Sequence, residues 1–329
     1  MPARTSTTST LPLFGEESGG PSSYAARNRE RIRRWAGRGV LFGSSSWKYP
    51  GWKGSIYTRS YPSREAFNAG CLAEYAEIFP TVCADFALYD FPDASAMRAI
   101  RAQSPDHFRL SLKVTDRITV ERYPRIPRYG PRGGTENPDF LNVELFEDAF
   151  LKPLEELGTK RGAVIFEFAA FPPRGGMTAE KFTALLDGFL ARLPRGYAYA
   201  VEIRNGEFLT PGYLAMLQAH GAAHVLSSWT RMPPLTEQLQ VEGVLRGPFS
   251  VARALLRPGR KYEEAVELFR PYSVIREENP GLRMGLAEAA RRSAAEGRTL
   301  YAYVNNRAEG NAPLTIQAVL DILEGETPR

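Results

Sequence analysis

A carboxylate and a guanidinium stand two residues apart at the end of the stretch YAYAVEIRN, residues 197–205. The stretch alternates and is rich in β-branched and aromatic residues, which predicts a β-strand. Because strand side chains alternate between two faces, Glu202 and Arg204 share one face and Tyr199, Val201 and Ile203 share the other. A charged face that is turned inward needs partners, since an unpaired buried charge is costly.

Further residues with chemical potential stand near the C-terminal ends of other predicted strands. Asp85, Glu167 and Glu202 are candidates for general acid–base catalysis, because crowding or burial can separate the pKa values of carboxyl groups. Lys113 is a candidate general acid, electrostatic partner or Schiff-base amine, and a salt bridge to a neighbouring carboxylate is its structural alternative. These four residues form the predicted catalytic set.

A second set of residues is suited to binding a ligand. Arginines can hold a carboxylate or phosphate by paired hydrogen bonds, Asn side chains suit hydroxyls or amides, and aromatic rings can form a wall against which a sugar or base stacks. Core packing explains any one of these rings equally well. The predicted substrate-binding residues are Arg204, Arg253, Asn305, Asn306, Ser44, Trp47, Trp52 and Tyr89.

The elements that must position these side chains alternate between short apolar strands and helical patterns, which is typical of βαβ units and a parallel sheet. Helical patterns cover residues 64–79, 94–103, 143–157, 179–193 and 211–220. Eight strand–helix repeats predict a single closed (β/α)8 TIM-like barrel, whose active site lies at the C-terminal ends of its strands. A doubly wound open sheet is the alternative, but no GxGxxG follows the first strand. The predicted strands are residues 41–47, 81–89, 108–114, 162–168, 197–205, 224–228, 249–256 and 299–306.

The net positive charge is concentrated in the N-terminal part of the chain. Residues 1–39 contain seven Arg and three Glu, a balance of +4, whereas the whole chain carries +5, so residues 40–329 carry only +1. We therefore predict a disordered, basic N-terminal arm at 1–39 and a barrel domain at 40–329. Residues 1–23 are rich in Ser, Thr, Gly and Pro, and a short basic helix follows, either docking Ile32 and Trp35 on the body or binding phosphate. The segment 116–140, with several Pro and Gly, is predicted to be a lid over the barrel or a surface excursion.

Several function classes lack their signatures. The three histidines, His107, His220 and His224, stand at the wrong ends of their strands, which disfavours a His-rich metal centre or a Ser-His-Asp triad. No metal-binding residue is predicted, although a divalent cation with oxygen ligands stays open as a cofactor. No Walker A, GxSxG or HExxH motif occurs, and two isolated cysteines suggest no disulfide framework. No apolar run is long enough to span a membrane and no secretory signal is evident, so we expect a cytoplasmic protein with no membrane partner.

Five blocks of the chain resemble the YecE-like family, also called domain of unknown function seventy-two. They are FGSSSWKYPGWKGSIY (42–57), TVCADFALYDFPD (81–93), HFRLSLKV (107–114), AVEIRN (200–205) and YVNNRAEGNAP (303–313). The resemblance implies a TIM-like barrel and a site, but no reaction. The matched polar positions that it adds are Tyr49, Tyr57 and Gly310. The chain departs from the family pattern at Asp85 and Glu167, where many relatives have Glu and Gln. It also lacks a His on the seventh strand and has Arg307 where a His is common, so that Arg257 or Arg307 would have to take over anion binding.

Three functions are compatible with these features. The first is an enzyme of the lyase, isomerase or hydrolase type, acting by acid–base chemistry on a small polar or anionic molecule that resembles a sugar, a sugar phosphate or a nucleotide. The second is a nucleic-acid-binding or nuclease-like protein that uses its basic residues. The third is a non-catalytic ligand-binding module, because a fold does not determine a function.

Overall fold

Eight parallel strands close into a barrel in chain order, β1 to β8, and β8 pairs with β1. The computed structural model describes residues 23–88 and 90–325. All eight predicted strands are confirmed, and seven of them end before their predicted last residue, where the chain turns into the loops of the barrel mouth. The strands are β1 (Val40–Ser44), β2 (Thr81–Ala84), β3 (Arg109–Lys113), β4 (Arg161–Glu167), β5 (Ala198–Glu202), β6 (Ala223–Ser228), β7 (Phe249–Ala254) and β8 (Thr299–Val304).

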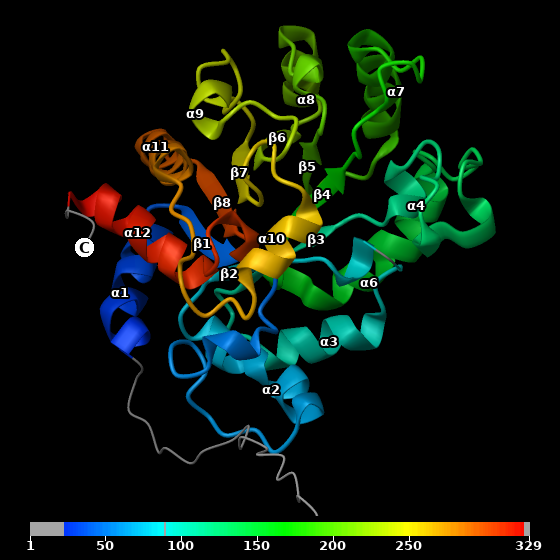
Figure 1. Ribbon diagram of the computed structural model, residues 1–329. Coiled ribbons are helices and arrows are strands. Elements are labelled where there is room, and N and C mark those ends of the chain that lie inside the picture. Colours follow the sequence, from blue (N-terminus) through cyan, green and yellow to red (C-terminus); the bar gives the residue numbers. More distant parts are fainter. Residues whose placement is uncertain (1–22, 89, 326–329) are drawn as a thin grey trace, which may run out of the picture.

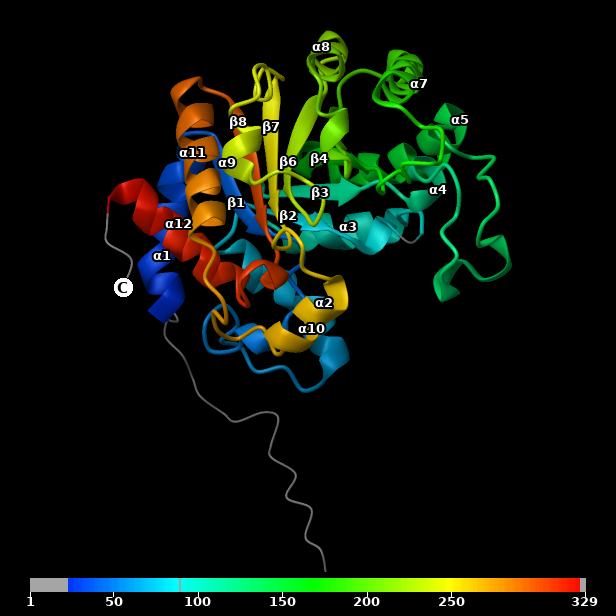
Figure 2. The ribbon, with the colours of Figure 1, turned by 45° about the horizontal axis from the view of Figure 1, so that its top comes forward.

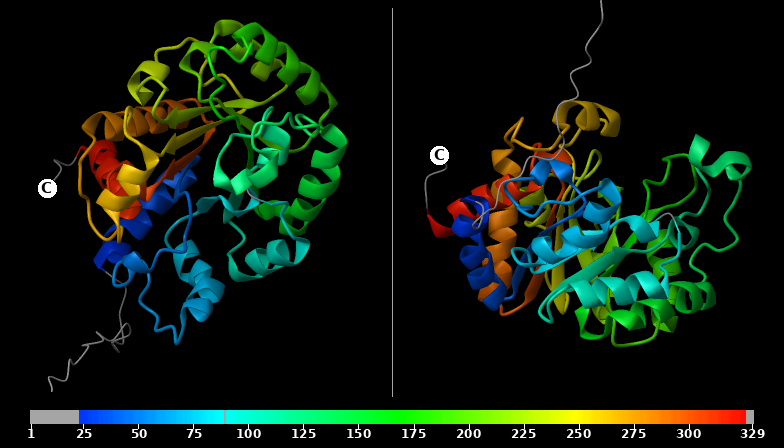
Figure 3. Two further views of the ribbon diagram at one scale, coloured as in Figure 1. Left: turned by 45° about the vertical axis from the view of Figure 1, so that its right-hand side comes forward. Right: turned by 90° about the horizontal axis from the view of Figure 1, so that it is seen from below.

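Helices surround the strands (Figures 1 and 3). The predicted helical patterns at 64–79, 94–103, 179–193 and 211–220 are confirmed, and the pattern at 143–157 is a series of short helical turns of changing pitch. Side-chain caps begin several helices, for example Ser63 on α2 and Thr178 on α7, where each accepts a hydrogen bond from a free backbone N–H. The helices are α1 (Ser23–Gly37), α2 (Arg64–Ala76), α3 (Ala94–Gln103), α4 (Asp116–Thr119), α5 (Val143–Phe146), α6 (Lys152–Leu154), α7 (Ala179–Arg192), α8 (Pro211–Ala219), α9 (Leu235–Gln238), α10 (Tyr262–Phe269), α11 (Pro280–Ala295) and α12 (Ala312–Glu324).

The two faces of the strands form two separate apolar clusters. Val201 and Ile203 belong to the large cluster between strands and helices, whereas Ala200 belongs to a small cluster inside the barrel. The alternation predicted for residues 197–205 is therefore confirmed. Inside the barrel, Tyr303 donates a hydrogen bond of 2.6 Å to Ser111 Oγ. Side chains therefore fill the interior of the barrel.

Helix α1 packs on the barrel. Ile32 and Trp35 are buried in the large cluster, and Arg31 and Arg34 pair with acidic residues near the end of α12. The short basic helix is thus confirmed in its docked form. The predicted arm at 1–39 differs from the structure over residues 23–37, because the apolar side of α1 outweighs its charge and joins the core. The rest of the stretch expected to be disordered, residues 1–22, lies outside the described residues.

Two long loops differ in where they lie. The segment 116–140 projects outward beyond α4 (Figure 2) and holds itself together through a small cluster of Val120, Tyr123 and Tyr129 and an ion pair between Arg117 and Asp139 at 2.6 Å. Residues 255–279, which we call the strap, follow β7 and include α10, which lies in front of the strands in Figure 1. The strap is tied to the loop after β8, since Asn311 donates a hydrogen bond of 2.9 Å to the carbonyl of Tyr272.

Within the described parts of the chain, no helix has both the length and the apolar character that crossing a bilayer requires.

Candidate active site

Six charged side chains gather at the C-terminal ends of the strands. They come from β3, β4, β5 and β7 and from the residues that directly follow β2 and β5. Three are acidic and three are basic, so the formal charges cancel. We call this group the charged layer; its members are Asp85, Lys113, Glu167, Glu202, Arg204 and Arg253.

Glu167 links the three cations of the charged layer. Its Oε2 lies 2.7 Å from Arg253 Nη1 and 3.3 Å from Lys113 Nζ. Its Oε1 lies 3.1 Å from Arg204 Nη2. Burial by itself would raise the pKa of this carboxyl, but the charges of Arg204, Lys113 and Arg253 hold the pKa of Glu167 well below its usual range. Glu167 is therefore an ionised hydrogen-bond acceptor at neutral pH.

Glu202 lies beneath this layer and is fully buried. Its Oε1 accepts one hydrogen bond of 2.8 Å from Ser227 Oγ, and the same oxygen lies 2.8 Å from Arg204 Nη2. Its Oε2 accepts a hydrogen bond from Arg253 Nη1. Both oxygens of Glu202 are thus occupied by protein donors, among them two guanidinium groups.

Lys113 is buried beside Asp85, the most exposed member of the layer. Lys113 Nζ lies 3.2 Å from Asp85 Oδ1. Burial opposes the ammonium form, yet the charges of Glu167 and Asp85 raise the pKa of Lys113, so the amine is protonated. The Asp85 side chain is 34% exposed, but its Oδ1 is buried and also lies 3.9 Å from Arg253 Nη2. Asp85 is therefore the most exposed of the three carboxylates of the layer.

Two site residues, one on β6 and one directly after it, were not among the predicted ones. Ser227 bridges Glu202 and Arg204, and the ring of Trp229 lies 4.0 Å from the guanidinium carbon of Arg204. Residues 224–228 were predicted as a strand, and their alternation with Val225 would have placed Ser227 inside the barrel. Trp229 lies beyond the predicted strand, so only its position two residues after Ser227 could have suggested it.

The structure does not bring all predicted binding residues to the charged layer. Ser44 faces the helices, where its Oγ lies 2.9 Å from Tyr75 Oη, because it shares a strand face with the outward-pointing Phe42. Ser45 is the residue of this loop that follows the inner face. Trp52 is fully buried in an aromatic stack with Tyr75 and is part of the core.

Three of the other predicted substrate-binding residues lie in the loops after β1 and β8, and the fourth is not among the described residues. Trp47 is buried in the loop after β1. Asn305 Oδ1 accepts a hydrogen bond of 2.9 Å from the backbone of Arg307, and Asn306 Oδ1 accepts one of 2.7 Å from Ala312, so both amides also cap short turns. Tyr89 lies outside the described residues.

The side chains of the site that could act as metal ligands do not favour a metal site. No group of three or more His, Cys, Asp or Glu side chains placed to hold an ion occurs within 23–88 and 90–325. The three carboxylates of the charged layer are each paired with Lys or Arg, whose positive charges occupy the place that a divalent cation would take. His224 lies on the helix-facing side of β6 beside Tyr213, away from the layer.

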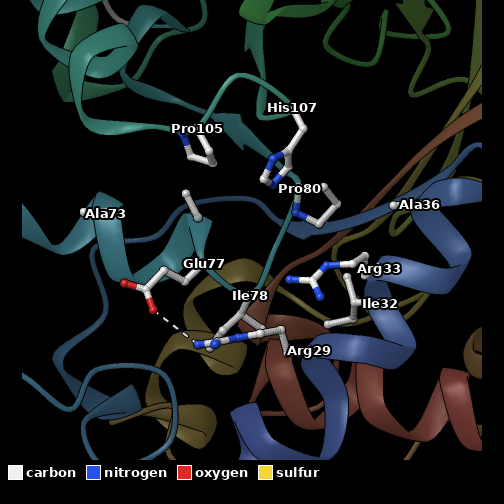
Figure 4. Close-up of a pocket in the computed structure, with 11 residues that line it drawn as sticks. Arg29, Ile32, Arg33, Ala36, Ala73, Glu77, Ile78, Pro80, Pro105 and His107 are labelled. Atoms are coloured by element: carbon white, nitrogen blue, oxygen red, sulfur yellow. Dashed lines mark hydrogen bonds and ion pairs between the residues drawn. The ribbon is translucent and has the colours of Figure 1, made fainter. Parts of the chain in front are cut away.

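A pocket at the opposite end of the barrel is separate from this site (Figure 4). It lies between α1 and α2, where Arg29 pairs with Glu77 at 3.2 Å, and its wall includes His107 just before β3. Active sites of this fold form at the other end, so the pocket is not our candidate.

The fold and the charged layer define a (β/α)8 barrel protein with a candidate site at the C-terminal ends of its strands. The chain belongs to the family described as "Protein of unknown function DUF72", which matches residues 41–329. The family expected from the sequence is thereby confirmed.

Solved structures of the same family share the fold. A DUF72 family protein from Enterococcus faecalis V583 has a TM-score of 0.57 and 17% identity, with 88% of this chain and 97% of that chain covered. A DUF72 family protein from Thermotoga maritima MSB8 has a TM-score of 0.54 and 16% identity, with 87% and 98% covered. No curated protein matches the chain.

Proposed function

We propose that this protein is an enzyme that acts by proton transfer on a small polar or anionic molecule bound at the C-terminal mouth of the barrel. The observation that carries the proposal is the charged layer itself. Burying six charged groups is costly, and replacing such a cluster by apolar residues is often neutral or stabilising. A cluster with this cost, at the end of the barrel where the fold builds its active sites, is better explained by chemistry than by stability.

The residues of the layer divide into two roles. Lys113, held protonated, is the general acid, and Asp85, the most exposed carboxylate of the layer, is the general base. Glu167 and the two arginines supply a fixed electrostatic environment, and Glu202 holds those arginines in place. An acid and a base on neighbouring strands suit isomerisation, epimerisation, elimination or hydrolysis.

The first experiment measures thermal unfolding against a panel of sugar phosphates, sugar acids, nucleotides and short DNA. A ligand at ~100 times its dissociation constant should stabilise the protein by ~2.7 kcal/mol. Compounds that raise the melting temperature are then incubated with the protein, and turnover is followed by NMR. Asp85→Asn should retain binding and lose turnover by roughly a hundredfold or more.

The matched control is Asp187→Asn, which changes a surface carboxylate paired with His220. Full turnover in this control and none in Asp85→Asn supports the assigned base. Binding without turnover in the wild-type protein favours a non-catalytic binding module instead.

The nucleic-acid alternative receives less support from the charges. Arg29, Arg31 and Arg34 of α1 are paired with acidic residues of α2 and α12, so these basic groups are already neutralised. Stabilisation by short DNA, weakening steeply with salt, would favour that alternative over a small-molecule substrate.

A further inference from the structure

Several buried N–H donors at the barrel mouth have no acceptor among the described residues. They are Trp47 Nε1, Arg253 Nε, Asn306 Nδ2 and Arg307 Nε. The side chains of Trp47, Arg253 and Asn306 are at least 95% buried. Buried donors are satisfied in nearly all native structures, so a group of free ones at a candidate site indicates a missing acceptor.

These donors occupy one sector of the barrel. Arg253 lies on β7, Asn306 and Arg307 directly follow β8, and Trp47 lies in the loop after β1. The three strands are neighbours in the closed sheet. The carboxylates of the charged layer lie elsewhere, at the ends of β2, β4 and β5. The mouth therefore has a donor side and a carboxylate side.

Arg307 gives the donor side an uncompensated positive charge. The three cations of the charged layer are paired with carboxylates, whereas Arg307 has no carboxylate within ion-pair distance in the part of the chain that is described. Its guanidinium carbon instead lies 4.5 Å from the ring centre of Tyr262 on the strap. Since the charged layer is neutral as a group, Arg307 adds a positive charge at this end of the barrel.

Tyr49 joins the strap to the loop that carries Trp47, since its backbone N–H donates a hydrogen bond of 2.9 Å to the carbonyl of Trp47. Its ring packs against Tyr272 of the strap, with a centroid distance of 5.6 Å. Burial raises the pKa of Tyr49 to about 12, the nearby charge of Arg307 opposes this rise, and that of Asp85 adds to it. Because β1 and β2 are neighbours in the closed sheet, the loop that carries Trp47 and Tyr49 begins next to the end of β2 that Asp85 follows.

We propose that Arg307 binds the carboxylate or phosphate group of the substrate, assisted by the free donors of Trp47 and Asn306. The hydroxyl-bearing part of the same molecule then lies against Asp85, Lys113 and Glu167. This inference rests on the proposed function and narrows its substrate class to a small hydroxylated oxyanion. A donor set without acceptors requires a ligand group that only accepts hydrogen bonds, and an oxyanion is that group.

The test uses pairs of compounds that differ in the anionic group: gluconate with glucitol, and ribose 5-phosphate with ribose. Dissociation constants are measured by isothermal titration calorimetry for the wild-type protein, Arg307→Gln and Arg307→Lys. The matched control is Arg246→Gln, which removes an exposed guanidinium paired with Glu242 on the surface. All variants are compared by circular dichroism and chemical unfolding to confirm the fold.

In the wild-type protein and in Arg246→Gln, the anionic member of at least one pair should bind about tenfold or more tightly than its neutral partner. Arg307→Gln should abolish this preference, and Arg307→Lys should retain part of it. The pair that shows the preference identifies carboxylate or phosphate as the preferred group.

Equal binding of neutral and anionic members, or an anion preference that survives in Arg307→Gln, overturns the role of Arg307. The proposed function remains in that case, because the neutral compounds still bind next to Asp85. Absence of binding by any member of either pair counts against both the inference and a sugar-like substrate.

Discussion

At the residue scale, the main feature is that each carboxylate of the charged layer is matched by a cation. Glu202 is the clearest case, since it is fully buried and both of its oxygens are bound by protein donors. A buried ion pair adds little net stability, but removal of one partner leaves an uncompensated charge in the interior. The layer is therefore sensitive to single substitutions even though it costs free energy as a whole.

We expect Glu202→Gln to lower the free energy of unfolding by about 3–5 kcal/mol, because Arg204 and Arg253 would lose a shared counter-charge. The measurement is urea unfolding at neutral pH. Glu242→Gln is the control, since its pairing with Arg246 is a surface contact and should change stability by no more than about 0.5 kcal/mol. Equal effects in the two variants would show that Glu202 does not hold the arginines.

His224 should make stability depend on pH. Burial lowers the pKa of His224 to about 4, against about 6.5 in an unfolded chain. Between these values the unfolded state binds more protons, so stability falls as the pH falls, by about 1 kcal/mol from pH 6.5 to 5.5. Urea unfolding across this range measures the slope.

His224→Gln should flatten that slope, whereas His107→Gln, which replaces an exposed ring, should retain it. An unchanged slope in His224→Gln would mean that another group causes the pH dependence.

At the element scale, backbone contacts hold the strap across the mouth. A Cβ added at Gly51 would lie 2.1 Å from the carbonyl oxygen of Pro271, and one added at Gly310 would lie 2.5 Å from that of Val274. The loops after β1 and β8 thus approach the strap more closely than any side chain allows. Tyr272 lies between the two contacting segments, so these contacts hold its ring beside Tyr49.

Gly51→Ala should therefore displace the strap and lower the free energy of unfolding by about 1–3 kcal/mol. Amide hydrogen exchange should accelerate in residues 270–276. The control is Gly188→Ala in the exposed middle of α7, where an added Cβ meets nothing within 4 Å. This change should stabilise the protein by about 0.5–1 kcal/mol. A loss of stability in both variants would point to a general effect of the substitution and not to the strap.

At the scale of the whole molecule, α1 belongs to the packed body. Trp35 is 5% exposed and Arg31 forms ion pairs of 2.8 Å with both Asp321 and Glu324. The first helix and α12 thus pack and pair with each other beside β1, and the positive charge of the described N-terminal residues is largely compensated there.

Trp35→Ala should lower the free energy of unfolding of the whole protein by about 3–5 kcal/mol, because it empties a buried site of a large ring. Arg33→Ala, which removes an exposed side chain from the same helix, should have an effect within about 0.5 kcal/mol. Differential scanning calorimetry compares the two variants with the wild-type protein. A Trp35→Ala protein that unfolds like the wild type would mean that α1 is an independent arm.

The sequence alone predicted the eight strands, the closed barrel and the inward direction of Glu202, Arg204, Lys113 and Glu167. The barrel followed from the count of eight strand–helix repeats. The side-chain directions followed from local alternation, since the face on which a strand residue lies depends only on its position relative to its neighbours. The polar residues near strand ends were likewise visible as a group.

Only the tertiary structure decided which charges pair, because each pair joins strands that are far apart in the sequence and meet on closure of the barrel. For the same reason, only the tertiary structure showed that Ser44 faces Tyr75 and lies away from the site. The tertiary structure also showed that Ser227 and Trp229 belong to the site. In the sequence, Arg307 was marked only by standing where a His is common in the family. Its lack of a counter-charge is a property of its surroundings, which no local pattern encodes.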